Sequence, residues 1–278
     1  EDNIDDGISG NIRIAYDSKE NRIFSITGSS SIFNVGVFYP ETDTWEQGAS
    51  LDISYSSSEF DFDVEYDPIS NLLVLSDYDA SQLEHIYTYN HSTQQWNEIT
   101  QCGGGIGENN GHWLDYNPYT EKVYLTKRYG QSSNNFYMYE IDVLQSSCEL
   151  FANNFGAPSS DASTVVFDSK RNRFLFIESD FNNSGDAVEN QIGIHEFTDY
   201  QMNEIEWMQF NDNEQYCFAT HNRMSAVYLP KEDKLLVLMK TGSCNNANAV
   251  GRPYIYDFMT DSWTINDSST SNTSSSGY

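Results

Sequence analysis

The sequence has few basic residues. Lys and Arg total 14 against 42 Asp and Glu, which gives a formal net charge of −28. Because phosphate groups need a basic surface, this balance excludes nucleic acid and anionic membranes as expected partners. We interpret the charge first as a solvated acidic surface, and calcium binding or a saline habitat are the alternative interpretations.

The sequence also lacks long apolar runs and the common catalytic motifs. No run of 18 apolar residues occurs, so no membrane span is expected. The cysteines have no C-x-x-C spacing and the histidines no H-E-x-x-H spacing, which disfavours a zinc site. G-x-S-x-G is absent, and the glycine-rich stretch after Cys102 is followed by no G-K-[ST]. We therefore assign no catalytic residue and expect no required cofactor, with calcium as the alternative.

Several features favour export. The chain opens with Glu1 rather than Met and has no signal-like apolar stretch, so we expect that a signal peptide has been removed. An even number of cysteines is most simply explained by two disulfides in a secreted protein, although the sequence alone does not fix their pairing. The cysteines are Cys102, Cys148, Cys217 and Cys244. Sequons for glycosylation lie at Asn90, Asn182, Asn266 and Asn272.

A phrase made of an aromatic residue, Asp or Asn, a polar turn and a β-rich run returns along the chain. Examples are "YDSKENRIF" from Tyr16, "YDPISNLLV" from Tyr66 and "YNPYTEKVY" from Tyr116. The anchors continue at Phe167 and Tyr228, at intervals of 50, 50, 51 and 61 residues. The Asp or Asn suits a tight turn, so each phrase predicts a hairpin between the first two strands of a repeat.

A second signature closes most repeats. It reads "FYPETDTW", which ends at Trp45, "YNHSTQQW", which ends at Trp96, and "YDFMTDSW", which ends at Trp263. Trp207 takes the same place after a longer turn, and Cys148 replaces the tryptophan in the third repeat. Four short strands per repeat of this length are typical of a propeller blade, because packing blades side by side buries both faces of each sheet.

These patterns predict an all-β fold, a five-bladed β-propeller of four-stranded antiparallel blades. Residues 1–10 are expected to form an N-terminal extension, and 11–265 the propeller. The repeats are expected near 11–50, 60–100, 110–152, 161–210 and 222–265. Residues 266–278 are rich in Ser, Thr and Asn, so we expect a linker or glycosylated stalk that leads to a wall, a membrane anchor or another module.

The strand ending in Tyr-Asp, the β-rich second strand and the "Y-D-x-x-T-x-x-W" ending resemble kelch-type β-propeller repeats. The chain departs from that family by lacking the Gly-Gly pair that normally closes the second strand; the second repeat has "SDY" there, for example. The resemblance implies a binding or assembly platform more often than an enzyme.

The long polar segments after the second strands are one candidate site. "SDYDASQ" from Ser76, "KRYGQSSNN" from Lys127 and "TGSCNNANAVGRP" from Thr241 are rich in polar residues and, in two cases, aromatic. Loops that meet on one propeller face would suit a sugar. The predicted ligand-binding residues are Asp77, Tyr78, Asp79, Arg128, Tyr129 and Arg252.

Charged residues on the innermost strands are a second candidate. Period-two alternation places them on equivalent sides of their strands. They are Arg13, Asp61, Asp63, Glu65, Asp115 and Arg223. Such a set predicts an ion network between blades, a cation site, or two carboxylates that flank a glycosidic bond.

Three functions follow from the sequence. The first is a secreted, non-enzymatic propeller that binds glycan or extracellular protein ligands through its loop face. The second is a structural subunit of an extracellular filament or surface assembly, which would require self-association through the terminal segments. The third is a carbohydrate-active enzyme that uses the inner-strand carboxylates.

Overall fold

The computed structural model describes most of the predicted strands. The described residues are 12–29, 31–53, 62–78, 83–103, 109–129, 135–156, 162–180, 191–198, 201–209, 224–241 and 250–265. These ranges contain 21 strands and no helix, and therefore no helix that could span a membrane. The expected extensions 1–10 and 266–278 lie outside them.

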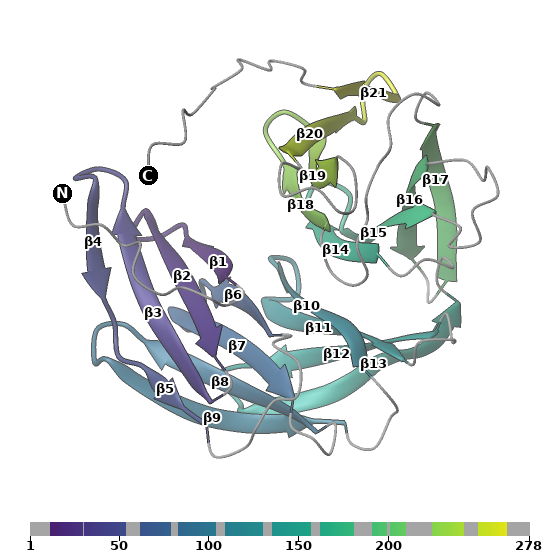
Figure 1. Cartoon of the computed structure of the whole chain (residues 1–278). Coiled ribbons are helices and arrows are strands. Elements are labelled where there is room, and N and C mark those ends of the chain that lie inside the picture. Colours follow the sequence, from purple (N-terminus) through teal and green to yellow (C-terminus); the bar gives the residue numbers. More distant parts are fainter. Residues whose placement is uncertain are drawn as a thin grey trace. The chain divides into compact units, whose positions relative to one another are not determined.

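The strands form five antiparallel meanders, the blades of an all-β, five-bladed β-propeller (Figure 1). Blade 1 contains β1 (Ile12–Asp17), β2 (Arg22–Ser29), β3 (Ile32–Tyr39) and β4 (Thr44–Gln47), with the short β5 (Leu51–Asp52) paired to β3. Blade 2 contains β6 (Asp63–Asp67), β7 (Leu72–Tyr78), β8 (Glu84–Asn90) and β9 (Gln95–Cys102). Blade 3 contains β10 (Asn109–Asn117), β11 (Lys122–Tyr129), β12 (Asn135–Asp142) and β13 (Ser147–Gly156).

The last two blades repeat the same order of strands. Blade 4 contains β14 (Ala162–Asp168), β15 (Arg173–Asp180), β16 (Gln191–Thr198) and β17 (Gln201–Gln209). Blade 5 contains β18 (Met224–Leu229), β19 (Lys234–Thr241), β20 (Val250–Asp257) and β21 (Ser262–Ile265). The fold class predicted from the repeat is confirmed.

The recurring phrase forms the hairpin between the first two strands of each blade, as predicted. In blade 1 the Asp17 carboxylate accepts hydrogen bonds from the backbone N–H groups of Lys19 and Glu20, at 2.9 and 3.1 Å. Asp67, Asn117 and Asp168 make the same contacts in blades 2 to 4. An Asp or Asn side chain that replaces backbone partners in this way is what the turn requires.

Each of these hairpins ends on a residue with positive φ. Asn21, Asn71 and Asn172 have φ of 50°, 61° and 52°. Asn tolerates this left-handed region better than most residues, which explains its place in the phrase. In blades 1 and 2 the tyrosine five positions earlier donates its hydroxyl to the same side chain, as Tyr16 does to Asn21 at 3.0 Å, whereas blade 4 has Phe167 at that position.

The chain divides into two compact units, Glu1–Ser159 with Phe197–Asn203, and Ser160–Glu196 with Glu204–Tyr278. In the first unit the inner strand β6 lies between β1 and β10. One apolar core, which includes Phe24 and Leu75, fills the space between blades 1 and 2, and another, which includes Ile86 and Leu125, fills that between blades 2 and 3. In the second unit β14 lies beside β18, and a core that includes Leu175 and Tyr254 joins blades 4 and 5.

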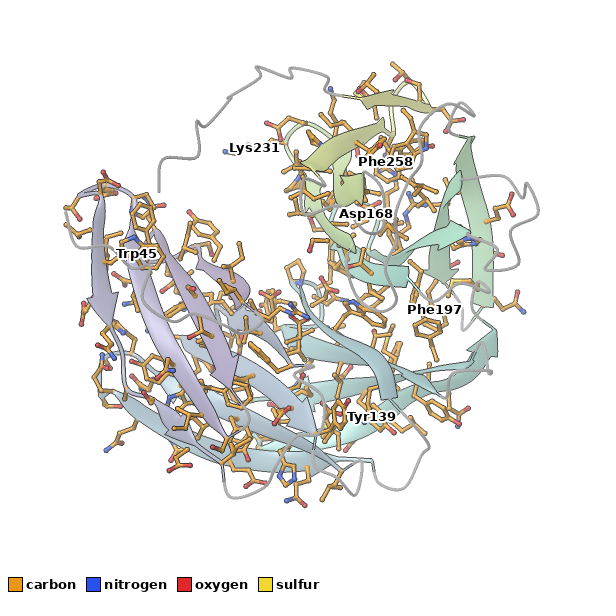
Figure 2. The ribbon with its side chains drawn as sticks, in the orientation of Figure 1. Trp45, Tyr139, Asp168, Phe197, Lys231 and Phe258 are labelled. Atoms are coloured by element: carbon orange, nitrogen blue, oxygen red, sulfur yellow. A yellow bond between two sulfur atoms is a disulfide. The ribbon has the colours of Figure 1, made fainter. Side chains whose placement is uncertain are left out.

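The Cys102–Cys148 disulfide joins the outer strands of blades 2 and 3, while Cys217 and Cys244 lie outside the described residues. Side chains from neighbouring blades meet between the sheets, where Figure 2 labels Tyr139. Trp96 and Trp263 pack against inter-blade cores as the second signature suggests. Trp45 instead keeps 53% of its surface exposed, so the first blade departs from this arrangement.

Candidate functional site

The innermost strands of the first unit bring charged side chains together at one end. We call this the loop end, where β7 ends and β8 begins, and we call the opposite end, with the hairpins described above, the turn end. Arg13 on β1 forms an ion pair with Asp63 on β6, with Nε and Oδ1 3.6 Å apart. The other oxygen of Asp63 accepts a hydrogen bond from the backbone N–H of Leu114 on β10, at 2.8 Å. One carboxylate therefore connects three blades.

This pair remains accessible from outside. The Arg13 side chain keeps 28% of its surface exposed and the Asp63 side chain 17%. The Arg13 guanidinium also lies over the ring of Phe62, 5.7 Å from its centroid, which favours one orientation of the charged group. A hydrogen-bond donor, the Arg13 guanidinium, and an acceptor, the Asp63 carboxylate, thus lie side by side, and both are partly exposed.

Glu65 follows two residues later on β6, so its side chain shares a sheet face with Asp63. Burial, with the nearby carboxylates of Asp63 and Asp67, raises the pKa of Glu65 to about 8, although a hydrogen bond from the N–H of Tyr66 opposes the shift. Glu65 is therefore mainly protonated at neutral pH and can donate a hydrogen bond. We call Arg13, Asp63 and Glu65 the inner-strand cluster.

A second group of polar side chains lies behind this cluster, between blades 2 and 3. Glu84 on β8 is fully buried, and its Oε2 lies 2.6 Å from Nζ of Lys127 on β11. Ser76 on β7 is also fully buried, and it is directly opposite Asp63 in the sheet register. Glu84 Oε1 and Ser76 Oγ have no hydrogen-bond partner within the described part of the chain. We call these three residues the buried polar row.

The predicted loop residues lie elsewhere than expected. Asp77 and Tyr78 were placed in an exposed loop, but they are the last residues of β7 and are 1% and 6% exposed. Arg128 and Tyr129 likewise end β11, and Arg252 lies within β20. The second strands run further than the repeat phrase indicates, because cross-strand pairing with the third strand continues to Tyr78–Glu84 and Tyr129–Asn135.

Other predicted residues are placed only in part. Asp115 lies on β10, where its partner across the sheet is Tyr124 of the same blade. Asp61, Asp79 and Arg223 lie outside the described residues, as do the sequons at Asn182, Asn266 and Asn272. Asn90 ends β8, and its Oδ1 accepts hydrogen bonds from the N–H and hydroxyl of Ser92.

Within the described ranges, no group of three or more His, Cys, Asp and Glu side chains could hold a metal ion. Asp63 already has a cationic partner and a backbone donor, which leaves fewer oxygen lone pairs for a cation. The inner-strand cluster in this unit is thus arranged as an ion pair beside a protonated acid.

Sequence reasoning missed the buried polar row. The signal was present in "EHIYTYN", because alternation places Glu84 on the same face as Ile86 and Thr88. A charged residue at a core position requires a partner, and Lys127 supplies it from the next blade. Pairing across blades could not be read from a single repeat.

Comparison with known proteins supports the fold alone. No protein-family model matches the sequence, and no curated protein is similar enough to indicate a family, so the kelch resemblance is not confirmed.

Solved structures that align with this chain include both lectins and enzymes. The SapL1 lectin in complex with α-methyl fucoside aligns with a TM-score of 0.60 at 11% identity, covering 92% of this chain and 79% of the lectin. The fungal Aleuria aurantia lectin, a six-bladed β-propeller with a novel fucose recognition mode, aligns with a TM-score of 0.58 at 8% identity, covering 91% and 75%. The GH93 α-L-arabinofuranosidase of Fusarium graminearum, in complex with arabinobiose, aligns with a TM-score of 0.58 at 10% identity, covering 92% and 80%.

Proposed function

We propose that this protein is a carbohydrate-binding propeller and that its ligand contacts the inner-strand cluster at the loop end of the first unit. The observation that carries this proposal is the partly exposed Arg13–Asp63 pair. A sugar hydroxyl both donates and accepts hydrogen bonds, so a guanidinium donor next to a carboxylate acceptor is suited to it.

Two further features support a sugar as the ligand. Protonated Glu65 adds a donor that a simple acidic surface would lack. The fold is shared with proteins whose structures contain or recognise fucose or arabinose units, which makes a glycan a reasonable class to test first. Secretion, glycosylation, self-association and a protein ligand remain predictions from the sequence.

The buried polar row has a positioning role in this proposal. Lys127 and Glu84 neutralise each other beneath the loop end, and Ser76 lies next to Asp63 in the register. Rigid neighbours keep Asp63 oriented, and an oriented group loses less conformational entropy when a ligand binds.

Binding of the labelled full chain to an array of neutral glycans tests the proposal. Arg13→Lys keeps the charge but removes the planar donor fork, so we expect about a tenfold loss of affinity for the best glycan. Arg22→Lys is the matched control, because Arg22 pairs with Asp17 at the turn end of the same blade. Equal losses for both variants, or no binding of any glycan, would contradict the proposed site.

A glycoside-active enzyme is the second candidate, and the high pKa of Glu65 favours it. A protonated acid beside an ionised carboxylate is the pair that glycoside hydrolysis uses. Both side chains lie on one face of β6, so the two carboxyl groups are near enough to act on one glycosidic bond. Hydrolysis of arabinan or of aryl glycosides that is lost in both Glu65→Gln and Asp63→Asn would establish this function. Retained turnover in both variants would exclude the role of this pair.

A further inference from the structure

An open pocket lies at the turn end of the first unit, between the turns of blades 2 and 3. It is lined by the turn after β6, the turn after β10 and the turn after β12, and its volume is about 120 Å³. At about 30 Å³ per water that volume would hold about four waters, so it can admit the end of one side chain. The inner-strand cluster lies at the opposite end of β6, so this pocket is not part of the proposed sugar site.

Most charges in the pocket already have partners. The Asp67 carboxylate accepts hydrogen bonds from the N–H groups of Ile69 and Ser70. Lys122 pairs with Asp142, which lowers the pKa of Asp142. The carboxylate of Glu121 differs, because no hydrogen bond or ion pair to it occurs among the described residues. An unpaired negative charge therefore lies at the wall of the pocket.

Glu121 also departs from the repeat. In blades 1, 2 and 5 the residue five positions after the tyrosine accepts its hydroxyl, as in Tyr16–Asn21 at 3.0 Å and Tyr228–Asp233 at 2.8 Å. Within the part of blade 3 that the structure describes, Tyr116 and Glu121 do not make this bond. Glu121 has φ of 57°, a conformation that Asn adopts more readily than Glu. Gln94 and Ser146 have similar φ values of 56° and 52° in other turns, so the missing hydroxyl contact, rather than φ, distinguishes Glu121.

Apolar side chains border the charged part of the pocket. Ile69 is 43% exposed and Leu144 is 64% exposed, and both line it. A lysine or arginine side chain has an aliphatic stem that can cover such residues while its charged head meets a carboxylate. The net charge of −28 further favours approach of a basic partner.

We propose that this pocket binds a lysine or arginine side chain of a partner protein, with the charged head at Glu121 and the aliphatic stem on Ile69 and Leu144. This gives the propeller a second binding surface at its turn end. A basic side chain complements both the unpaired acid and the apolar border, whereas a sugar would leave the apolar border uncovered.

Titration of the full chain with the peptide acetyl-Leu-Arg-Leu-amide tests this proposal, with binding followed by NMR of the isoleucine and leucine methyl groups. We expect shifts at Ile69 and Leu144, and weaker binding of the citrulline peptide, which lacks the charge. Equal binding of the two peptides, or shifts confined to other residues, would overturn the proposal.

Glu121→Asn is the decisive variant, because it introduces the residue that blades 1 and 2 use at this turn. We expect a threefold to fivefold loss of affinity for the arginine peptide, about the strength of one exposed ion pair, with no loss of folding stability. Asp43→Asn is the matched control, since Asp43 is an exposed residue with φ of 53° in a turn of blade 1. Unchanged peptide affinity in Glu121→Asn would contradict the proposal.

Two additional readouts distinguish this pocket from the sugar site and from a metal site. Glycan binding is expected to be equal in Glu121→Asn and the parent chain, so failure of the sugar site and failure of this pocket give different results. Calcium chloride is the competing probe. Displacement of the arginine peptide by calcium at equal ionic strength would identify a metal site instead and overturn the proposal.

Discussion

Two interfaces between blades can be compared, one between blades 2 and 3 and the other between blades 4 and 5. They contain different polar groups. Both have an apolar core between sheets. Blades 2 and 3 add the Cys102–Cys148 disulfide and the buried pair Glu84–Lys127. Blades 4 and 5 add an ionic network, in which Arg171 of blade 4 donates to both oxygens of Asp233 of blade 5, at 2.7 and 2.8 Å.

The charged groups at the two interfaces differ in how completely their oxygen atoms are paired. In the second unit each oxygen of Asp233 has two donors, because Lys170 and Tyr228 add contacts at 2.9 and 2.8 Å. The Arg171 guanidinium also lies over the ring of Phe258, which Figure 2 labels, with its Cζ 4.6 Å from the ring centroid. In the first unit Glu84 Oε1 and Ser76 Oγ have no partner among the residues that the structure describes. In the second unit the Asp233 oxygens are fully paired, and one buried atom without a described partner is Nε1 of the uncharged Trp263.

The difference in pairing suggests different roles for the Asp233 network and the buried polar row. A fully paired network holds two blades together and leaves little for a ligand. A buried row with unmatched atoms lowers stability, and such a cost is commonly found near functional sites. The first unit combines the incompletely paired row with the partly exposed Arg13–Asp63 pair, so it is the better candidate for ligand binding.

The largest expected effect comes from removing the Cys102–Cys148 disulfide between blades 2 and 3. The double variant Cys102→Ala with Cys148→Ala removes the disulfide, whose two cysteines are 46 positions apart in the sequence. Chain entropy predicts a loss of about 4 kcal/mol in the free energy of unfolding. Urea unfolding with hydrogen exchange should show weaker protection of blades 2 and 3. Protection lost equally in blades 4 and 5 would show that the disulfide acts on the whole chain.

A smaller loss is expected from breaking the buried pair in the first unit. Glu84→Gln leaves Lys127 charged and buried, which should lower the free energy of unfolding by about 3 kcal/mol. The double variant Glu84→Leu with Lys127→Met removes both charges and should recover most of that loss. If the double variant is less stable than Glu84→Gln, the pair contributes to stability by itself.

The network in the second unit should respond more moderately to Asp233→Asn, because Asn tolerates the φ of 56° at this position and keeps part of the hydrogen bonding. We expect a loss of about 2 kcal/mol, the contribution of hydrogen bonds to a charged group. Arg171 holds the pKa of Asp233 well below its usual range. The stabilisation is therefore present above the pKa of the unfolded chain and is lost as pH falls, so parent and variant should converge in acid. A constant difference down to low pH would contradict this assignment.

The smallest effect concerns the pH dependence contributed by Glu65. Its pKa is raised from 4.5 to about 8, so the folded protein binds one more proton than the unfolded chain between these values. Stability from this group is complete below 4.5 and decreases as pH rises toward 8, by about 1–2 kcal/mol after allowance for partial exposure. Glu65→Gln should remove this slope relative to the parent chain. An unchanged slope would show that Glu65 titrates normally.

Much of the fold could be predicted because each blade repeats the same local chemistry. Asp17, Asp67 and Asn117 act within their own hairpins, so one phrase contains the information for each turn. The ends of the second strands could not be predicted, because Asp77 and Tyr78 are fixed by pairing with β8 rather than by their own sequence.

The candidate site was partly predictable for the same reason. Alternation along β6 correctly groups Asp63 with Glu65 on one face, since that depends on neighbouring residues alone. The partners Arg13, Leu114 and Lys127 come from other blades, and a single sequence does not specify such contacts. The unpaired Glu121 became apparent only when the hairpins of several blades could be compared.

The most direct test of the central claim is the affinity of the full chain for its best neutral glycan, compared between Arg13→Lys and Arg22→Lys. We predict about a tenfold loss for Arg13→Lys and an affinity equal to the parent chain for Arg22→Lys, with similar melting temperatures. Equal affinity in all three proteins would show that carbohydrate does not bind at the inner-strand cluster.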